Sequence, residues 1–306
     1  MRKIYILICV MSFMFLTKTH AQQNPQYTQY MYNMNVINPA YAGSKESLSV
    51  GTLFRDQWSG ISGAPQTFTF AAHAPVGNNL GIGLSGINDK IGPVEQTDLM
   101  ADVSYTLRLA GEWNLAFGVK AGATFHDIGL AGINTQISND PAFGSNYNET
   151  YGIFGAGMFL YSDKFYIGLS VPNFLESTHF VTDGETAFGN QERHFFGTMG
   201  YVFDLNDFIK FKPSTFVKTQ ISNFDSSYLS YDFNANFLFY ERFEVGASYR
   251  VDDAFSALVG VKPFEWMHVG FAYDATQSDL NRPSYEAFII FDIFFKKKAY
   301  LSPRYF

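Results

Sequence analysis

The chain has 306 residues, a formal net charge of −7 at pH 7, 18% aromatic and 16% charged residues, and a single cysteine. This acidic balance argues against nucleic acid as a partner, because phosphate backbones select basic surfaces. No stretch after the first 21 residues reaches eighteen consecutive apolar residues, so a bundle of membrane-spanning helices is excluded as well.

The first 21 residues are typical of a cleaved signal peptide. Two basic residues precede an apolar run over 4–16, and residues 19–21 fit the small-x-Ala pattern before a cleavage site. The apolar run is too short to cross a bilayer comfortably. We therefore expect an exported chain that begins near Gln22, has no cysteine because Cys9 leaves with the signal, and carries a formal net charge of −10. Without disulfides, its stability has to come from backbone pairing and burial.

Residues 22–46 are expected to form a separate N-terminal segment. Asn24 and Pro25 fit the N-cap and first position of a helix, and Asn38-Pro39 would end it. An apolar stripe at helical spacing lies between them, formed by Tyr27, Tyr30, Met31 and Met34. One short amphipathic helix of this kind would suit a plug in the periplasmic mouth of a barrel or a docking site for a partner. A loosely ordered tether is the alternative.

Residues 47–295 divide into about fourteen segments in which apolar and polar residues alternate, the pattern of β-strands with one apolar face. High aromatic content, low charge and this alternation together predict an all-β fold, a transmembrane outer-membrane β-barrel of about 14 antiparallel strands. A soluble all-β protein is the competing interpretation, and it would need its apolar face only on the core side.

The predicted connections differ in length between the two ends of the barrel. Those after even-numbered strands are short turns, whereas the long ones, such as 127–149 and 173–190, follow odd-numbered strands. Outer-membrane barrels have this layout, with short periplasmic turns and longer external loops. An even strand count then places both termini on the periplasmic side.

Two local features bear on the interior. GIGLSG at 81–86 matches the dinucleotide pattern G-x-G-x-x-G, but it lies inside a predicted strand and no helix follows. We interpret its alternating glycines as leaving lumen space for the N-terminal segment or a loop. Pro213 also lies inside a predicted strand, where it cannot donate to a ladder, and it predicts a bulge or a bend.

The last predicted strand is apolar on both faces. Ala287, Ile289, Phe291, Ile293 and Phe295 point one way, and Phe288, Ile290, Asp292 and Phe294 point the other. We expect lipid to cover the odd-numbered face and the contents of the barrel to cover the other. Residues 296–306 would follow as a periplasmic C-terminal tail.

The sequence points to no catalytic, metal or cofactor site. It has no nucleophile elbow, and the five histidines after the signal show no metal-ligand spacing. We therefore predict that the chain is not an enzyme and binds no cofactor, and that inward polar residues such as His73, His268 and Asp274 line a lumen. Arg55 and Trp58 end the first strand. They fit partner contacts and, equally, a lumen-facing arginine beside an interfacial tryptophan.

Four stretches of the chain resemble one known family, the PorP/SprF family of type IX secretion system membrane proteins. They are QYTQYMYNMNVINPAYAG at 26–43, Phe54-Arg55-Asp56-Gln57-Trp58, Gly63-Ala64-Pro65-Gln66-Thr67 with His73 and Pro75, and the chain end Ser302-Pro303-Arg304-Tyr305-Phe306. The resemblance spans the chain after the signal, although the two long loops carry no recognisable signature.

This resemblance implies a barrel in contact with the lipid of the cell outer membrane that belongs to the machinery for protein export and gliding motility. It implies two kinds of partner: other type IX secretion components, and a secreted cargo protein with a type IX C-terminal signal domain, expected to be a large surface adhesin. Whether the chain is SprF-like or PorP-like stays open. An outer-membrane channel or transporter for small solutes, hydrophobic ones included, is the alternative function.

The resemblance also selects candidate functional residues. The partner-docking candidates are Tyr27, Tyr30, Met31, Met34, Asn38, Pro39, Tyr41, Gly43, Arg55 and Trp58. An aromatic chain end resembles the signal that barrel-insertion machinery reads, so the barrel-assembly candidates are Pro303, Arg304, Tyr305 and Phe306.

Overall fold

The computed structural model describes residues 27–132, 146–175, 193–221, 229–277 and 282–295, a strand pair at 181–182 and 185–186, and Arg304. The predicted signal peptide at 1–21, the predicted helix start at Asn24-Pro25 and most of the predicted tail lie outside these residues. Among the described residues, no helix has both the length and the apolar character needed to cross a bilayer.

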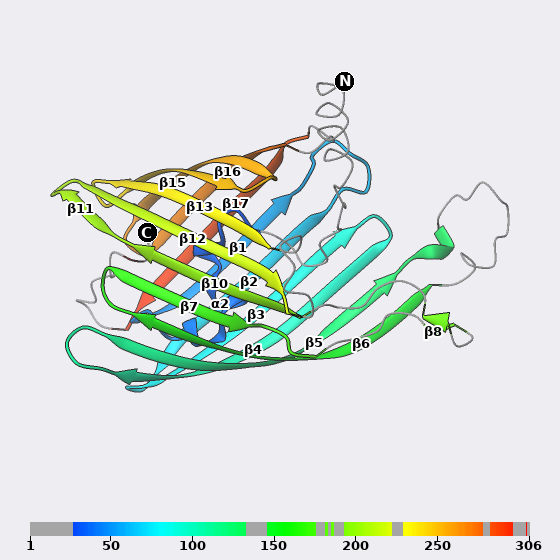
Figure 1. Ribbon diagram of the computed structural model, residues 1–306, viewed down its shortest axis with the longest axis horizontal. Coiled ribbons are helices and arrows are strands. Elements are labelled where there is room, and N and C mark those ends of the chain that lie inside the picture. Colours follow the sequence, from blue (N-terminus) through cyan, green and yellow to red (C-terminus); the bar gives the residue numbers. More distant parts are fainter. Residues whose placement is uncertain are drawn as a thin grey trace, which may run out of the picture.

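The strands form one closed antiparallel barrel (Figure 1). They are β1 (Ser47–Asp56), β2 (Gln66–Val76), β3 (Leu80–Ile91), β4 (Val94–Arg108), β5 (Asn114–Ile128), β6 (Tyr147–Tyr161), β7 (Phe165–Val171), β10 (His194–Tyr201), β11 (Phe203–Asn206), β12 (Ile209–Gln220), β13 (Ser230–Phe239), β14 (Phe243–Arg250), β15 (Ala254–Phe264), β16 (Met267–Thr276) and β17 (Ser284–Phe294). The strands β8 (Val181–Thr182) and β9 (Glu185–Thr186) pair only with each other.

Two pairings close the circle: β1 with β17, and β10 with β12. Because β10 and β11 pair with successive parts of β12, they count as one strand of the wall. The closed barrel then has fourteen strands. The prediction of an all-β barrel with about 14 antiparallel strands is confirmed.

The break between β10 and β11 has a cause in the neighbouring strand. Gly200 pairs with Ser214, and the next residue on β12 is Pro213, which has no N–H to donate. Pairing resumes only at Phe203 with Phe211. Between them, the backbone N–H of Val202 turns to the carbonyl of Lys164 at 2.9 Å, and its side chain is fully buried. The irregularity predicted from Pro213 is confirmed.

The outer surface of the wall is apolar, and aromatic rings gather towards both rims. Large side chains exposed there include Ile82, Leu84, Val103, Val119 and Val259. Exposed rings near the short turns are Trp113, Tyr201, Phe208, Tyr240 and Trp266, and exposed rings near the opposite rim are Phe68, Tyr231, Phe255 and Tyr273. An apolar band between two aromatic girdles is the surface that a lipid bilayer covers.

The connections separate by length as the sequence predicts. One end of the barrel carries only short turns, such as 77–79, 109–113 and 162–164, and β1 begins and β17 ends there. The opposite end carries the longer loops, including 57–65 and 129–146, together with two short ones at 92–93 and 251–253. We call these the short-turn end and the long-loop end.

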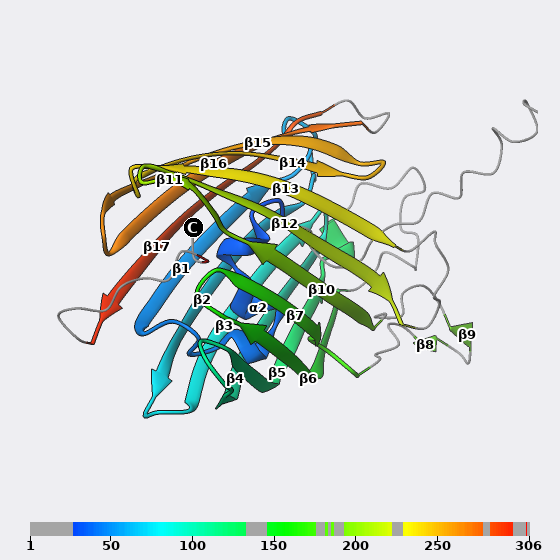
Figure 2. The same cartoon turned by 60° about the vertical axis from the view of Figure 1, so that its left-hand side comes forward.

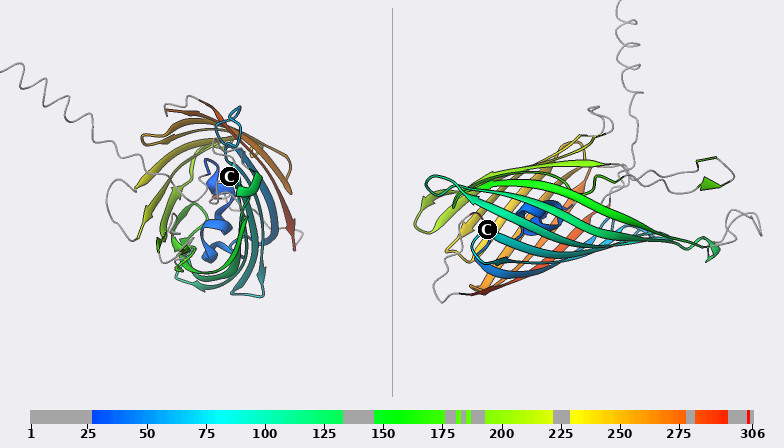
Figure 3. Two further views of the ribbon diagram at one scale, coloured as in Figure 1. Left: turned by 90° about the vertical axis from the view of Figure 1, so that its right-hand side faces the viewer. Right: turned by 90° about the horizontal axis from the view of Figure 1, so that it is seen from below.

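The last strand behaves as its pattern predicts. Ile293 is 55% exposed on the outer surface, whereas Phe288 and Ile290 are buried inside. The interior is filled by the chain before β1, which shows as the dark blue segment within the wall in Figures 2 and 3.

That N-terminal segment is not the single helix predicted from its spacing. It contains three short pieces, η1 (Tyr30–Tyr32), α2 (Met34–Ile37) and η2 (Pro39–Tyr41), while a further turn, η3 (Leu130–Gly132), follows β5. Asn33 breaks the first two pieces with φ −126° and ψ 28°. The prediction is wrong because the side chains of this segment contact the wall on several sides, so its backbone follows the lumen rather than presenting one apolar face.

Candidate functional site: the N-terminal segment inside the barrel

The N-terminal segment, residues 27–46, is the main content of the lumen in the described part of the chain. Gln29, Tyr30 and Ala40 have no exposed surface. The segment runs from the long-loop end, where Tyr27 lies beside Arg250, to the short-turn end, where Lys45 precedes β1. Its first described residues are therefore at the end of the barrel opposite to the start of β1.

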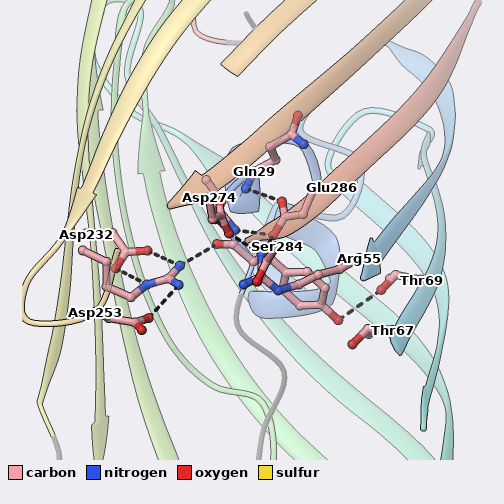
Figure 4. A network of polar contacts seen from close by, with 12 residues as sticks. Gln29, Arg55, Thr67, Thr69, Asp232, Asp253, Asp274, Ser284 and Glu286 are labelled. Carbon is pink, nitrogen blue, oxygen red and sulfur yellow. Dashed lines mark hydrogen bonds and ion pairs between the residues drawn. The ribbon is translucent and has the colours of Figure 1, made fainter. Parts of the chain in front are cut away.

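A cluster of buried charges holds the beginning of the segment (Figure 4). Arg55, near the end of β1, donates from Nη1 to Oδ2 of Asp274 at 2.7 Å and to Oε1 of Glu286 at 2.5 Å. The backbone N–H groups of Thr28 and Gln29 donate to the two Glu286 oxygens at 2.7 and 2.9 Å. We call Arg55, Asp274, Glu286, Thr28 and Gln29 the carboxylate clamp.

The electrostatics of this clamp explain its composition. One arginine faces two carboxylates, and all three side chains are at most 3% exposed. The unbalanced negative charge is met by hydrogen bonds, because Thr28 also donates from its hydroxyl to Asp274 Oδ2 at 2.8 Å. A buried charge that keeps such partners is tolerated, whereas one that loses a partner is strongly destabilising.

A second arginine reinforces the same end. Arg250, the last residue of β14, forms a bidentate pair with Asp232, both distances being 2.9 Å, and a third contact with Asp253 at 3.2 Å. Its Nη2, which also pairs with Asp232, donates to the carbonyl of Tyr27 at 3.4 Å. The hydroxyl of Tyr27 lies 3.0 Å from that of Thr69 on β2. Tyr27 is thereby tied to both sides of the wall.

Stacked aromatic rings fix the middle of the segment. Tyr30 stacks on Phe216 of β12 with ring centroids 4.8 Å apart, and its hydroxyl donates to Ser214 at 3.2 Å. Tyr32 stacks on Phe288 of β17 at 4.2 Å. This stacking accounts for the buried apolar face of the last strand, because the partner of Phe288 is a ring of the N-terminal segment.

Tyr32 also donates a hydrogen bond to the carboxylate of Glu244, which is buried on β14. Burial, and secondly the negative charge of Glu244, raise the pKa of Tyr32 well above its ordinary value, so the hydroxyl keeps the proton that it donates. Asn236 donates to the same carboxylate at 2.6 Å, and His268 lies 3.5 Å from its second oxygen. Two donors thus meet at one oxygen of Glu244, and His268 lies near the other.

On the opposite wall, a buried ion pair meets the helix α2. Lys120 of β5 lies 2.8 Å from Asp102 of β4, and neither side chain is exposed. Asn35 donates its side-chain amide to Asp102 at 3.1 Å and accepts from Lys120 through its carbonyl at 3.4 Å. Asn35 therefore forms a hydrogen bond with each of the two charged side chains.

The Asn38-Pro39 pair fixes the turn into η2. The side chain of Asn38 accepts from the backbone N–H of Ala40 at 3.0 Å, which caps η2, and Pro39 occupies its first position. The amide nitrogen of Asn38 donates outward to the carbonyl of Met158 on β6 at 3.0 Å. This asparagine joins the local turn to the barrel wall.

Glycines on the inner face of the wall let the segment approach by its backbone. A Cβ built on Gly118 would lie 2.3 Å from the backbone nitrogen of Ala40, and one on Gly81 would lie 2.1 Å from the carbonyl oxygen of Ala42. Gly43 itself has φ +71° and meets Gly81 at 2.5 Å by the same measure, so only glycine suits both positions. The interpretation of the 81–86 glycines as space for the N-terminal segment is confirmed.

The short-turn end of the lumen is closed by two more cations. Lys45 lies 3.1 Å from Asp292 of β17 and 3.2 Å from the hydroxyl of Ser49. Arg304 donates to the carbonyls of Ser44 at 3.1 Å and Ser162 at 2.6 Å, and its guanidinium covers the ring of Tyr161 at 4.5 Å. Arg304 thus joins the chain end to the N-terminal segment and to the β6–β7 turn.

The structure brings most of the candidate residues together inside the barrel. Those packed in the lumen are Tyr27, Tyr30, Met31, Met34, Asn38, Pro39, Tyr41, Gly43 and Arg55. Trp58 lies apart from them in the loop after β1, with φ 52° and its backbone N–H on the Ser284 hydroxyl at 3.1 Å. Arg304 reaches the segment, whereas Pro303, Tyr305 and Phe306 lie outside the described residues.

Sequence reasoning missed three charged residues that hold the segment, Glu244, Arg250 and Glu286. Each lies on the inward parity of its strand, opposite the exposed apolar residues, and that parity is the signal that would have found them. Their partners come from strands far away in the sequence, which no local pattern reveals.

Among the described residues, a small cavity remains beside the packed segment. A cavity of about 40 Å³ lies between the segment and β1, β2, β16 and β17, which is room for a few water molecules. Among the described residues, no group of three or more histidine, cysteine, aspartate or glutamate side chains is placed to hold a metal ion. The chemistry of the site is recognition of one polypeptide segment by a barrel wall.

Solved structures similar to this chain are also barrels. The toluene transporter TbuX of Ralstonia pickettii has 12% sequence identity and a TM-score of 0.50, with 86% of this chain and 93% of that chain covered. The CymD monoaromatic hydrocarbon channel has 10% identity and a TM-score of 0.52, with 86% and 92% covered. At this level of identity the likeness concerns the fold alone. No curated protein matches the chain.

One family covers nearly the whole sequence. Residues 19–292 match the family described as type IX secretion system membrane protein PorP/SprF. This range contains every strand of the barrel except the last two residues of β17, and it contains the complete N-terminal segment. The chain is therefore an outer-membrane β-barrel that belongs to the PorP/SprF family of type IX secretion system membrane proteins.

Proposed function

We propose that this barrel docks, exports or anchors a secreted surface protein of the adhesin type, as an outer-membrane component of the type IX secretion and gliding machinery. The observation that carries the proposal is the family match over residues 19–292. The partners in this proposal are a cargo protein with a type IX C-terminal signal domain and other components of the secretion system.

The filled lumen supports a protein-handling role over a solute channel. The segment that fills the barrel is held by buried ion pairs and stacked rings, and the described cavity beside it has a volume of about 40 Å³. The likeness to hydrocarbon transporters extends only to the fold, so it does not favour transport of such molecules here.

An orientation and a division of the chain accompany this proposal. Residues 1–21 act as the signal peptide, 22–46 as the plug or docking segment, 47–295 as the barrel and 296–306 as the tail. The short-turn end faces the periplasm and the long-loop end faces outward, as in other outer-membrane barrels.

Deletion of the gene, followed by mass spectrometry of the culture medium and the cell surface, tests the proposal. Loss of one large adhesin with other cargo retained identifies a dedicated cargo partner, and loss of all type IX cargo identifies a core component. An unchanged set of exported proteins with altered solute uptake contradicts the proposal and favours a channel.

Two tryptophans offer a matched pair for complementation. Trp58 lies in a loop at the long-loop end, and Trp113 lies in a turn at the short-turn end, outside the lumen. If the cargo docks on the outward side, Trp58→Ala reduces its display at an unchanged barrel level, and Trp113→Ala does not. The reverse result places docking on the periplasmic side.

A further inference from the structure

The path of the N-terminal segment has a consequence for the topology of the whole chain. We propose that the chain before Tyr27 leaves the barrel through the long-loop mouth, so that the two ends of the processed protein lie on opposite sides of the outer membrane. This replaces the expectation that both termini are periplasmic, and it rests on the orientation given under the proposed function.

The direction of the segment is the first support. Its beginning is bonded to the long-loop ends of strands: Tyr27 to Arg250, the last residue of β14, and Gln29 to Glu286, near the start of β17. Its end meets the short-turn ends, because Lys45 pairs with Asp292 near the end of β17. The segment thus crosses the lumen from one mouth towards the other.

The packing of the lumen is the second support. A chain that turned back from Tyr27 to the short-turn mouth would have to pass the buried cluster that includes Tyr30, Met34, Phe159, Tyr166 and Phe216. That cluster is close-packed around the segment itself, and the cavity beside it holds about 40 Å³, far less than a polypeptide needs. The chain before Tyr27 can therefore leave the lumen through the long-loop mouth without crossing this cluster.

Cysteine labelling tests this topology directly, because the only cysteine, Cys9, lies in the predicted signal. Three full-length variants are made: Gln23→Cys in the amino end, Ser62→Cys in the exposed β1–β2 loop and Glu112→Cys in the exposed β4–β5 turn. Intact cells are treated with a membrane-impermeant maleimide, and a second sample is treated after the outer membrane is opened.

The proposal predicts that the thiols at 23 and 62 react in intact cells to the same extent, and that the thiol at 112 reacts only after opening. A thiol at 23 that behaves like the one at 112, or that reacts only after denaturation, overturns it. The reference pair reports on orientation alone: if 112 reacts in intact cells and 62 does not, the orientation given under the proposed function is wrong. Measurement of cargo display in the same strains reports separately on that function.

Discussion

The two walls that face the N-terminal segment hold it in different ways. The wall of β3 to β7 meets it through glycines, so that the backbones approach until no Cβ fits at Gly81 or Gly118. The wall of β12 to β17, together with the neighbouring strand β1, meets it through side chains, with stacked rings at Phe216 and Phe288 and charges in the carboxylate clamp. The first wall therefore restricts how close the backbone of the segment can lie. The second selects the aromatic and hydrogen-bonding groups that the segment carries.

The two walls should therefore respond differently to substitutions. A backbone contact through glycine cannot relax by a change of rotamer, and the wall strand cannot move away without breaking its own hydrogen-bonded ladder. A side-chain contact can relax by changing rotamers, and its cost depends on whether a buried charge loses a partner. In the glycine-rich wall, the buried charges of Lys120 and Asp102 also contact the segment, through Asn35.

The largest effect is expected from filling the glycine-rich wall. Gly118→Leu places a Cβ 2.3 Å from the Ala40 nitrogen and adds a branched side chain where the segment runs. We expect a loss of more than about 3 kcal/mol, seen as loss of the heat-modifiable folded band on gels. Gly197→Ala is the matched control, since its nearest neighbours lie at 3.8 Å. Normal folding of Gly118→Leu would contradict the backbone contact.

Removal of Arg55 is the next largest perturbation, on the opposite wall. Arg55→Met leaves Asp274 and Glu286 buried without their shared cation, and we expect a loss of about 3–5 kcal/mol in urea unfolding in lipid vesicles. Arg108→Met, which removes a surface arginine, should leave stability unchanged.

A double variant sharpens this prediction. Arg55→Met combined with Glu286→Gln removes one of the stranded charges, so it should be more stable than the simple sum of the two single changes. Additive losses would mean that the clamp is not a coupled unit.

A smaller loss is expected from Tyr32→Phe, which keeps the stacking on Phe288 and removes the hydrogen bond to Glu244. A bond to a buried carboxylate contributes about 1.5–3 kcal/mol, and Asn236 remains as a donor, so the lower part of this range is expected. Tyr240→Phe, at a ring that is 64% exposed, is the control. Equal unfolding midpoints for the two variants would show that the hydrogen bond from Tyr32 to Glu244 does not stabilise the barrel.

The smallest loss is expected from Arg304→Ala at the short-turn mouth. The change removes two hydrogen bonds to carbonyls and a cation–π contact with Tyr161, together about 1–2 kcal/mol. Arg242→Ala, which removes a bond to the Pro263 carbonyl at the surface, is the comparison. A larger effect on outer-membrane level than on the stability of purified protein would assign Arg304 to assembly rather than to closure of the mouth.

Period-two alternation was sufficient to predict the wall, because every strand needs one face for lipid and one for the lumen. Pro213 and the 81–86 glycines predicted a break and a close approach, since both residue types act through the backbone, which a sequence shows directly. The segment at 27–46 was predicted less well. Its stripe of Tyr30, Met31 and Met34 is apolar at helical spacing, yet the lumen that surrounds it fixes its shape.

The carboxylate clamp shows why part of the site could not be predicted from the sequence. Arg55 was a candidate and Asp274 was expected to point inward, but Glu286 and Arg250 were not singled out. The clamp forms only when β1, β16 and β17 close around Thr28 and Gln29. Register across the β1–β17 seam, and not any local motif, places Arg55 opposite Glu286.

Ion conductance of the purified barrel in planar lipid bilayers tests the central claim most directly, namely that the N-terminal segment fills the lumen as part of the folded barrel. Because buried ion pairs and stacked rings hold the segment against both walls, we predict no steady conductance for the complete chain. A steady open pore would contradict the account, since ions would then cross a lumen in which the segment leaves a cavity of only about 40 Å³ beside it.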